Sequence, residues 1–126
     1  MFNPSDFLTL AEELAQSGED ESKIRTSIGR TYYAAFLNTR EQLKIGGWEF
    51  PKTAEAHWKV REILQKYGGE GRVLADKLLK LSRIRDNADY ELGQTFEQKT
   101  AFRKIKLAQK IIEKVKEKKF EKLSES

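Results

Sequence analysis

The sequence predicts an all-α protein, an antiparallel up-and-down bundle of four to five helices. Three observations lead to this prediction. The chain has 126 residues but only two prolines. Its apolar residues recur at the three- and four-residue spacing of amphipathic helices, and no segment alternates apolar and polar residues over the length of a strand. The expected helices are long and their links are short, which favours antiparallel neighbours.

The first two helices are indicated by a start signal and by an apolar centre. Asn3 and Pro4 suit the beginning of the first helix, because asparagine caps helix N-termini and proline is tolerated in the first turn. The second helix is expected over residues 21–44. Its middle, residues 32–37, reads YYAAFL and is apolar on nearly every side, so this helix should be the central one. Gly29 within it would permit a close helix crossing.

The third and fourth helices are expected over residues 53–67 and 72–91. The glycine-rich segment 68–71 should form a break between them. The loop before the third helix contains Trp48 and Phe50, and both side chains are expected to fold back over the end of the core.

The last helix is expected to begin with a capping box, in which Thr95 caps the first turn and Gln98 returns a hydrogen bond. Residues 103–122 contain nine Lys or Arg against three Glu, whereas the whole chain has a formal net charge of +4. The basic character is therefore concentrated in this helix, and the rest of the chain is slightly acidic. Its lysine-rich face either binds a polyanion or is a solvated surface.

Several classes of protein are not indicated. The chain has no apolar run that is long enough to cross a membrane, and its first residues lack the pattern of a signal peptide. It has no cysteine, which removes disulfides and thiolate metal sites. Neither a glycine-rich phosphate loop nor metal-ligand spacing is present, so no metal or cofactor is expected. We expect a cytoplasmic protein with one domain over residues 1–122 and a frayed tail at 123–126.

One residue breaks the apolar pattern of the fourth helix. Arg85 stands in the seam of apolar residues that should face the core. A guanidinium inside a bundle is costly unless it is paired, and Asp89 lies one turn later on the same face. Acidic residues near the helix end, including Asp86, also oppose the helix dipole. Such conflicts mark either a functional site or a structural network with Tyr32 or Tyr33.

Two motifs in the sequence resemble those of a known family. Residues 30–36 read RTYYAAF and residues 85–90 read RDNADY, and together with His57 they resemble the HEPN superfamily. The resemblance implies an antiparallel helical bundle, commonly a homodimer, that often accompanies a small nucleotidyltransferase in toxin–antitoxin or defence systems. Many members are metal-independent endoribonucleases that use an arginine and a histidine a few residues further on. Here Asp89 and Tyr90 stand where that histidine would be, and His57 is the only histidine.

The seam arginine and its neighbours form the candidate site. Arg85 could hold a phosphate with two parallel hydrogen bonds, and Asp89 would orient its side chain. Arg30 and Tyr33, one turn apart on the second helix, would form the opposite wall. Arg83 and Asn87 on the fourth helix would line the rim. The candidate catalytic residues are Arg85, Asp89 and Tyr90, and the candidate nucleotide- or RNA-binding residues are Arg30, Tyr33, Arg83, Asp86 and Asn87.

Three functions are open at this point. The first is a HEPN-domain homodimer that binds a nucleotide or RNA in the cleft between its subunits, as part of a toxin–antitoxin or defence system with a nucleotidyltransferase partner and without a membrane. The second is a metal-independent endoribonuclease in which Asp89, Tyr90 or His57 assists Arg85. The third is a non-catalytic helical interaction module, in which the Arg85–Asp89 pair only fixes the dimer. The simplest interpretation of His57 alone is a half-buried residue near a helix start.

Overall fold

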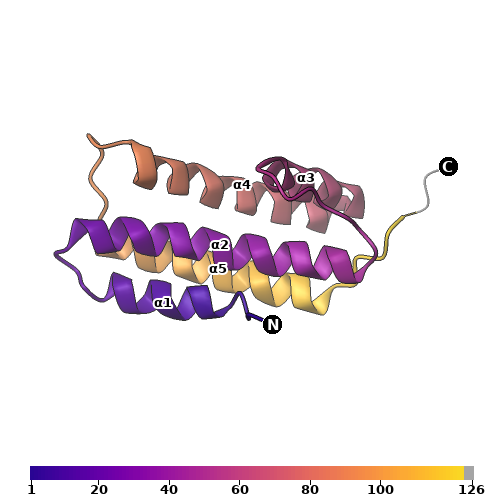
Figure 1. Cartoon of the computed structure of the whole chain (residues 1–126), viewed down its shortest axis with the longest axis horizontal. Coiled ribbons are helices and arrows are strands. Elements are labelled where there is room, and N and C mark those ends of the chain that lie inside the picture. Colours follow the sequence, from indigo (N-terminus) through magenta and orange to yellow (C-terminus); the bar gives the residue numbers. More distant parts are fainter. Residues whose placement is uncertain (124–126) are drawn as a thin grey trace.

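The computed structural model describes residues 1–123, and this part of the chain is all-helical without any strand. The expected fold class is thus confirmed. The helices are α1 (Asp6–Ala15), α2 (Glu21–Ile45), α3 (Glu55–Leu64), α4 (Gly68–Tyr90) and α5 (Gln98–Glu117), with a short 3-10 turn, η1 (Gln65–Tyr67), between α3 and α4. Helices α1, α2, α4 and α5 alternate in direction along one long axis, whereas α3 runs in the same direction as α2, because the loop before it folds back (Figure 1).

Helix α2 is the centre of the bundle, as its apolar middle predicted. It contacts each of the other four α-helices. In Figure 1, α1 and α5 lie along one side of α2, α4 lies along the other, and α3 packs on the first half of α4. Tyr32, Ala34, Ala35 and Phe36 are all buried, because these side chains point from one helix into several neighbours at once.

The start of α1 differs slightly from the prediction. The predicted N-cap is wrong, because Ser5 precedes the first helical residue and, within residues 1–123, no side chain caps this helix. Asn3 Oδ1 instead accepts a hydrogen bond from the Ser5 backbone N–H at 3.0 Å. This bond closes the turn before the helix, which itself begins at Asp6. Asn3 and Pro4 therefore set the direction in which the chain enters α1.

The predicted break at 68–71 is wrong in its extent. Only Gly68 adopts a positive φ, 74°, and α4 begins at that residue. Gly71 lies inside the helix, and a Cβ added there would be 2.0 Å from the carbonyl oxygen of Leu64. The glycines therefore allow α4 to start in direct contact with the end of α3, and no flexible link separates the two helices.

The predicted capping box at the start of α5 is also wrong. The N-cap of this helix is Glu97, and no side chain caps it. Gln98 instead donates from Nε2 to the carbonyl oxygen of Ala15 at 2.9 Å. Its side chain thus satisfies the C-terminal end of α1 and joins α5 to the first hairpin of the bundle.

The loop between α2 and α3 folds back over the core end, as expected for its aromatic residues. Trp48 is buried and donates from Nε1 to the Tyr67 hydroxyl at 2.7 Å, while Phe50 is half-buried. The C-terminal segment crosses the same place, because the Lys122 backbone N–H donates to the carbonyl oxygen of Gly46 at 2.8 Å. Of the tail expected at 123–126, only Leu123 belongs to the described residues.

Within residues 1–123, no helix combines the length and the apolar composition that a membrane-spanning segment requires.

Candidate functional site

Arg85 points toward α2, as the seam of α4 predicted. Its side chain is only 18% exposed. Gly29 of α2 faces it, since a Cβ added to this glycine would lie 4.0 Å from both Arg85 Cγ and Asp89 Oδ1. That separation is an ordinary van der Waals contact, so the crossing of α2 and α4 does not require a glycine here.

Two carboxylates hold the guanidinium of Arg85. Its Nη2 lies 2.7 Å from Asp86 Oδ1, and its Nη1 lies 3.5 Å from Asp89 Oδ2. The pair expected from the spacing of Arg85 and Asp89 is therefore present. The side chains of Asp86 and Asp89 are 54% and 41% exposed, so both reach solvent. Arg85 Nε, by contrast, is buried and has no hydrogen-bond partner among the described residues.

Aromatic rings of α2 pack against the same guanidinium. The guanidinium carbon of Arg85 lies 5.3 Å from the ring centre of Tyr32 and 5.6 Å from that of Tyr33. The guanidinium carbon of Arg30 lies 5.0 Å from the same Tyr33 ring centre. The structure thus brings Arg30, Tyr33 and Arg85 together, with both cations in contact with the tyrosine ring.

His57 of α3 joins this group through Tyr32. The Tyr32 hydroxyl and His57 Nδ1 are 2.5 Å apart, within hydrogen-bond distance. The imidazole stacks on Phe36 with ring centres 4.3 Å apart, and the edge of the Tyr33 ring lies against it. No local sequence pattern places His57 beside Arg85, because the two residues lie on different helices, and only the fold brings them into one group.

The environment shifts the pKa values of both hydrogen-bonded groups. Burial raises the pKa of Tyr32 to about 12, so its hydroxyl keeps its proton at neutral pH. Burial lowers the pKa of His57 below its ordinary value, and the positive charges of Arg85 and Arg61 lower it further. His57 is therefore a neutral imidazole that accepts a proton only below neutral pH. We call Arg30, Tyr32, Tyr33, His57, Arg85, Asp86 and Asp89 the Arg85 cluster.

Three of the predicted site residues lie outside this cluster. Arg83 is exposed, Asn87 is half-buried, and Tyr90 is 74% exposed at the end of α4. Within residues 1–123, none of their side chains makes a hydrogen bond, ion pair or ring contact with the cluster. At about 3.6 residues per turn, Arg83 and Asn87 lie on nearly the opposite side of α4 from Arg85, so the structure does not bring them to the cluster.

One important residue near the site was missed by the sequence analysis. Arg25 of α2 donates to the carbonyl oxygens of Ala88 at 2.9 Å, Glu91 at 3.1 Å and Gln94. Its side chain is only 16% exposed. This cation satisfies the C-terminal end of α4, where the acidic residues made the helix dipole unfavourable. The spacing of four residues between Arg25 and Gly29 was the only available signal, since both lie on the face of α2 toward α4.

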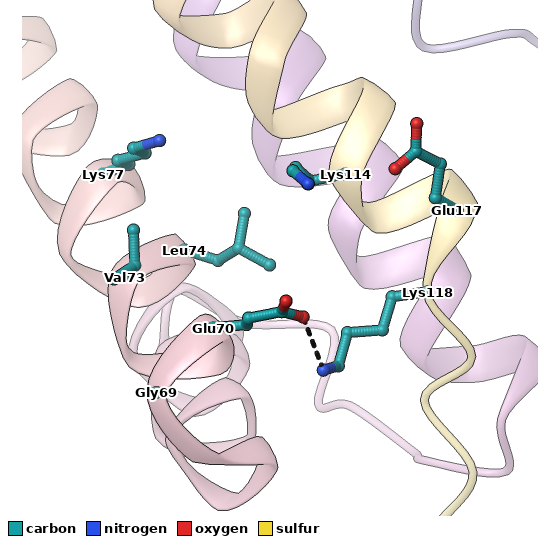
Figure 2. A pocket seen from close by; sticks show the side chains of 8 residues that line it. All are labelled: Gly69, Glu70, Val73, Leu74, Lys77, Lys114, Glu117 and Lys118. Atoms are coloured by element: carbon teal, nitrogen blue, oxygen red, sulfur yellow. Dashed lines mark hydrogen bonds and ion pairs between the residues drawn. The ribbon is translucent and has the colours of Figure 1, made fainter.

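The main grooves of the surface lie away from the cluster. Figure 2 shows one of about 620 Å³ between the start of α4 and the end of α5, where Lys118 Nζ binds Glu70 Oε2 at 3.0 Å. Lys77 and Lys114 flank Leu74 in its floor (Figure 2). A second groove of about 630 Å³ lies between α3 and the preceding loop, beside Trp58. Neither groove contains a residue of the Arg85 cluster.

Comparison with known proteins places this chain in a family. It matches the HEPN domain over residues 4–118. Uncharacterized protein MJ0628 of Methanocaldococcus jannaschii is 35% identical in an alignment 108 residues long that covers 73% of this chain and 65% of that protein. Uncharacterized protein MJ0992 of the same organism is 32% identical in an alignment 110 residues long that covers 73% of this chain and 62% of that protein. The chain thus spans less than two thirds of the length of these relatives, and no solved structure matches it significantly. The match over residues 4–118 shows that the chain belongs to the HEPN domain family.

Proposed function

We propose that this HEPN-domain protein binds a phosphate group of a nucleotide or RNA at Arg85. The observation that carries the proposal is the position of this arginine. It occupies an apolar seam, and within residues 1–123 its Nε has no hydrogen-bond partner. Its two terminal nitrogens pair only with the half-exposed carboxylates of Asp86 and Asp89. A buried cation of this kind is costly to maintain, which is more easily explained by a ligand than by stability.

A phosphate would bind where the carboxylates now lie. Arg85 can present two parallel N–H groups to two phosphate oxygens. Asp86 occupies one of these positions at 2.7 Å, but its side chain is 54% exposed and can turn into solvent. Asp89 would remain as the group that orients the guanidinium. Arg30, whose guanidinium carbon lies 5.0 Å from the Tyr33 ring centre, adds positive charge near the proposed site.

The full cleft is proposed to form between two copies of the chain. Neither of the two grooves described above includes Arg85, and a second copy would supply a wall that closes the site. A cytoplasmic toxin–antitoxin or defence system with a nucleotidyltransferase partner is the setting that the family resemblance suggests.

Binding of a short fluorescent RNA, measured by polarisation at fixed salt, tests this proposal. We expect Arg85→Ala to weaken binding at least tenfold, because the loss of a paired charge contact to phosphate costs about 1.5–3 kcal/mol. Arg72→Ala is the matched control, since Arg72 is an exposed arginine on the same helix. Equal affinity of all three proteins would remove the proposed site. Sedimentation of the protein with and without RNA tests the dimer separately.

Metal-independent RNA cleavage is a second candidate, favoured by the position of His57. Such cleavage needs a base that takes the proton of the 2′-hydroxyl, and a group with a pKa near neutral does this best. Among the side chains considered, only the imidazole of His57 belongs to a residue type that ordinarily titrates near neutral pH. Incubation with total RNA in the presence of a chelator decides the question. Cleavage must depend on both Arg85 and His57, otherwise this function is excluded.

A purely structural role for the ion pair predicts a different result. In that case Arg85→Met would give a folded, partner-binding protein, and neither RNA binding nor cleavage would depend on residue 85. This combination of results would favour the non-catalytic interaction module.

A further inference from the structure

His57 is held in one orientation by three aromatic side chains. Phe36 stacks on its ring at 4.3 Å, Tyr32 lies parallel to it at 5.6 Å, and Tyr33 presents an edge at 5.9 Å. Its Nδ1 is used by the Tyr32 hydroxyl. Among the described residues, no protein group bonds to its Nε2. The ring is therefore fixed while one nitrogen stays available.

The charges around His57 are mainly positive. Cations reach it from three helices and oppose an additional positive charge on the imidazole, whereas one carboxylate favours it. Burial and these positive charges together lower the pKa of His57, so the imidazole is neutral at neutral pH. The charged groups that act on His57 are Arg85 and Asp86 of α4, Arg61 of α3 and Arg40 of α2, and its titratable ring neighbours are Tyr32 and Tyr33.

We propose that a phosphodiester bound at Arg85 causes His57 to take up one proton from solvent, so that the imidazolium becomes a second cationic arm of the site. This inference rests on the proposed function, because it requires an anion at Arg85. The anion offsets the field of the guanidinium, which is one of the two main causes that keep the ring neutral. The proton in turn strengthens the attraction between site and ligand.

The Tyr32 hydroxyl suits both states of the ring. It can donate to Nδ1 of the neutral imidazole, and its oxygen can accept from Nδ1–H of the imidazolium. With a pKa of about 12, Tyr32 keeps its own proton in either case. The proton that enters therefore stays on the imidazole, and Nε2–H is left to donate to a phosphate oxygen.

A single NMR signal can test this inference, because His57 is the only histidine of the chain. The probe is a 2′-O-methyl dinucleotide with one phosphodiester and no terminal phosphate. Its charge is constant where imidazole titrates, and it lacks the 2′-hydroxyl needed for cleavage. The imidazole is titrated in the full chain with and without saturating probe. We expect a higher His57 pKa in the complex, and an affinity that rises by up to about tenfold for each unit that the pH falls.

Two variants separate the possible outcomes. His57→Gln should retain binding but lose this pH dependence, while Arg85→Ala should lose binding. An unchanged His57 pKa in a saturated, Arg85-dependent complex would overturn the inference and leave the proposed function intact. A probe that does not bind at all would overturn both. Because the decisive titration uses the unmodified protein, a folding defect of either variant cannot obscure the result.

Discussion

Replacement of Arg25 by methionine tests the contact that closes the end of α4. The guanidinium donates to three carbonyl oxygens, at Ala88, Glu91 and Gln94, and its side chain is 84% removed from solvent. Methionine keeps much of the apolar stem but makes none of these bonds. The carbonyl group of Ala88 lies in a part-buried position and would lose its Arg25 partner.

The size of the effect follows from the environment of each bond. A part-buried bond from a charged donor contributes about 1.5–3 kcal/mol, whereas the more exposed bonds to Glu91 and Gln94 contribute less because water replaces the donor. The ion pair with Glu21 is 46% exposed on the acidic side, so it adds little. We expect the free energy of unfolding to fall by about 2–4 kcal/mol in total.

Urea denaturation followed by circular dichroism measures this loss. Arg72→Met is the control, since it removes an exposed arginine of α4 and should change stability by less than about 0.5 kcal/mol. Hydrogen exchange should locate the damage in the last turn of α4, which carries Asp89. A loss for Arg25→Met no larger than that of the control would refute the idea that this arginine closes the helix end.

Three further predictions concern packing and charge. Gly71→Ala should lower the free energy of unfolding by about 1–3 kcal/mol, because its Cβ would lie 2.0 Å from the Leu64 carbonyl oxygen. Gly69→Ala should raise it slightly, because a Cβ there would have nothing described within 4 Å. Thermal denaturation compares the two variants. Tyr32→Phe should cost about 1–2 kcal/mol in urea denaturation, since it leaves His57 Nδ1 without its partner, and an unchanged stability would contradict the hydrogen bond. The folded-state pKa of His57 lies below its ordinary value of 6.5, so the unfolded chain binds this proton first and the protein should lose stability as pH falls below about 6.5. His57→Gln should remove that part of the pH dependence of the free energy of unfolding. Parallel pH dependences of the two proteins would disprove this prediction.

Features that depend on residues near one another in sequence could be predicted. The YYAAFL segment indicated a helix covered on several sides, and α2 is the central helix. The four-residue spacing of Arg85 and Asp89 indicated an ion pair, which is present at 3.5 Å. In both cases helical periodicity alone fixes which side chains share a face.

Features that depend on contacts between helices could not be predicted. Gln98 has the spacing of a capping residue, yet it binds the end of α1, a group 83 residues away. The glycines at 68–71 have the composition of a loop, yet Gly71 permits close contact between α3 and α4. His57 reaches Tyr32 only because the loop before α3 folds back, and no local pattern specifies the rotation of α3 about its axis.

The aromatic and acidic contacts of Arg85 also determine what ligand binding would cost. Two tyrosine rings and two carboxylates already restrict the rotamers of its long side chain. Immobilising a flexible arginine on binding costs about 0.5–1.5 kcal/mol in conformational entropy. For Arg85, much of this cost is already met during folding. The affinity of this preorganised residue for phosphate would then be limited by the Asp86 carboxylate, which must turn away from it, so we expect Asp86→Asn to bind phosphate more tightly than the natural sequence.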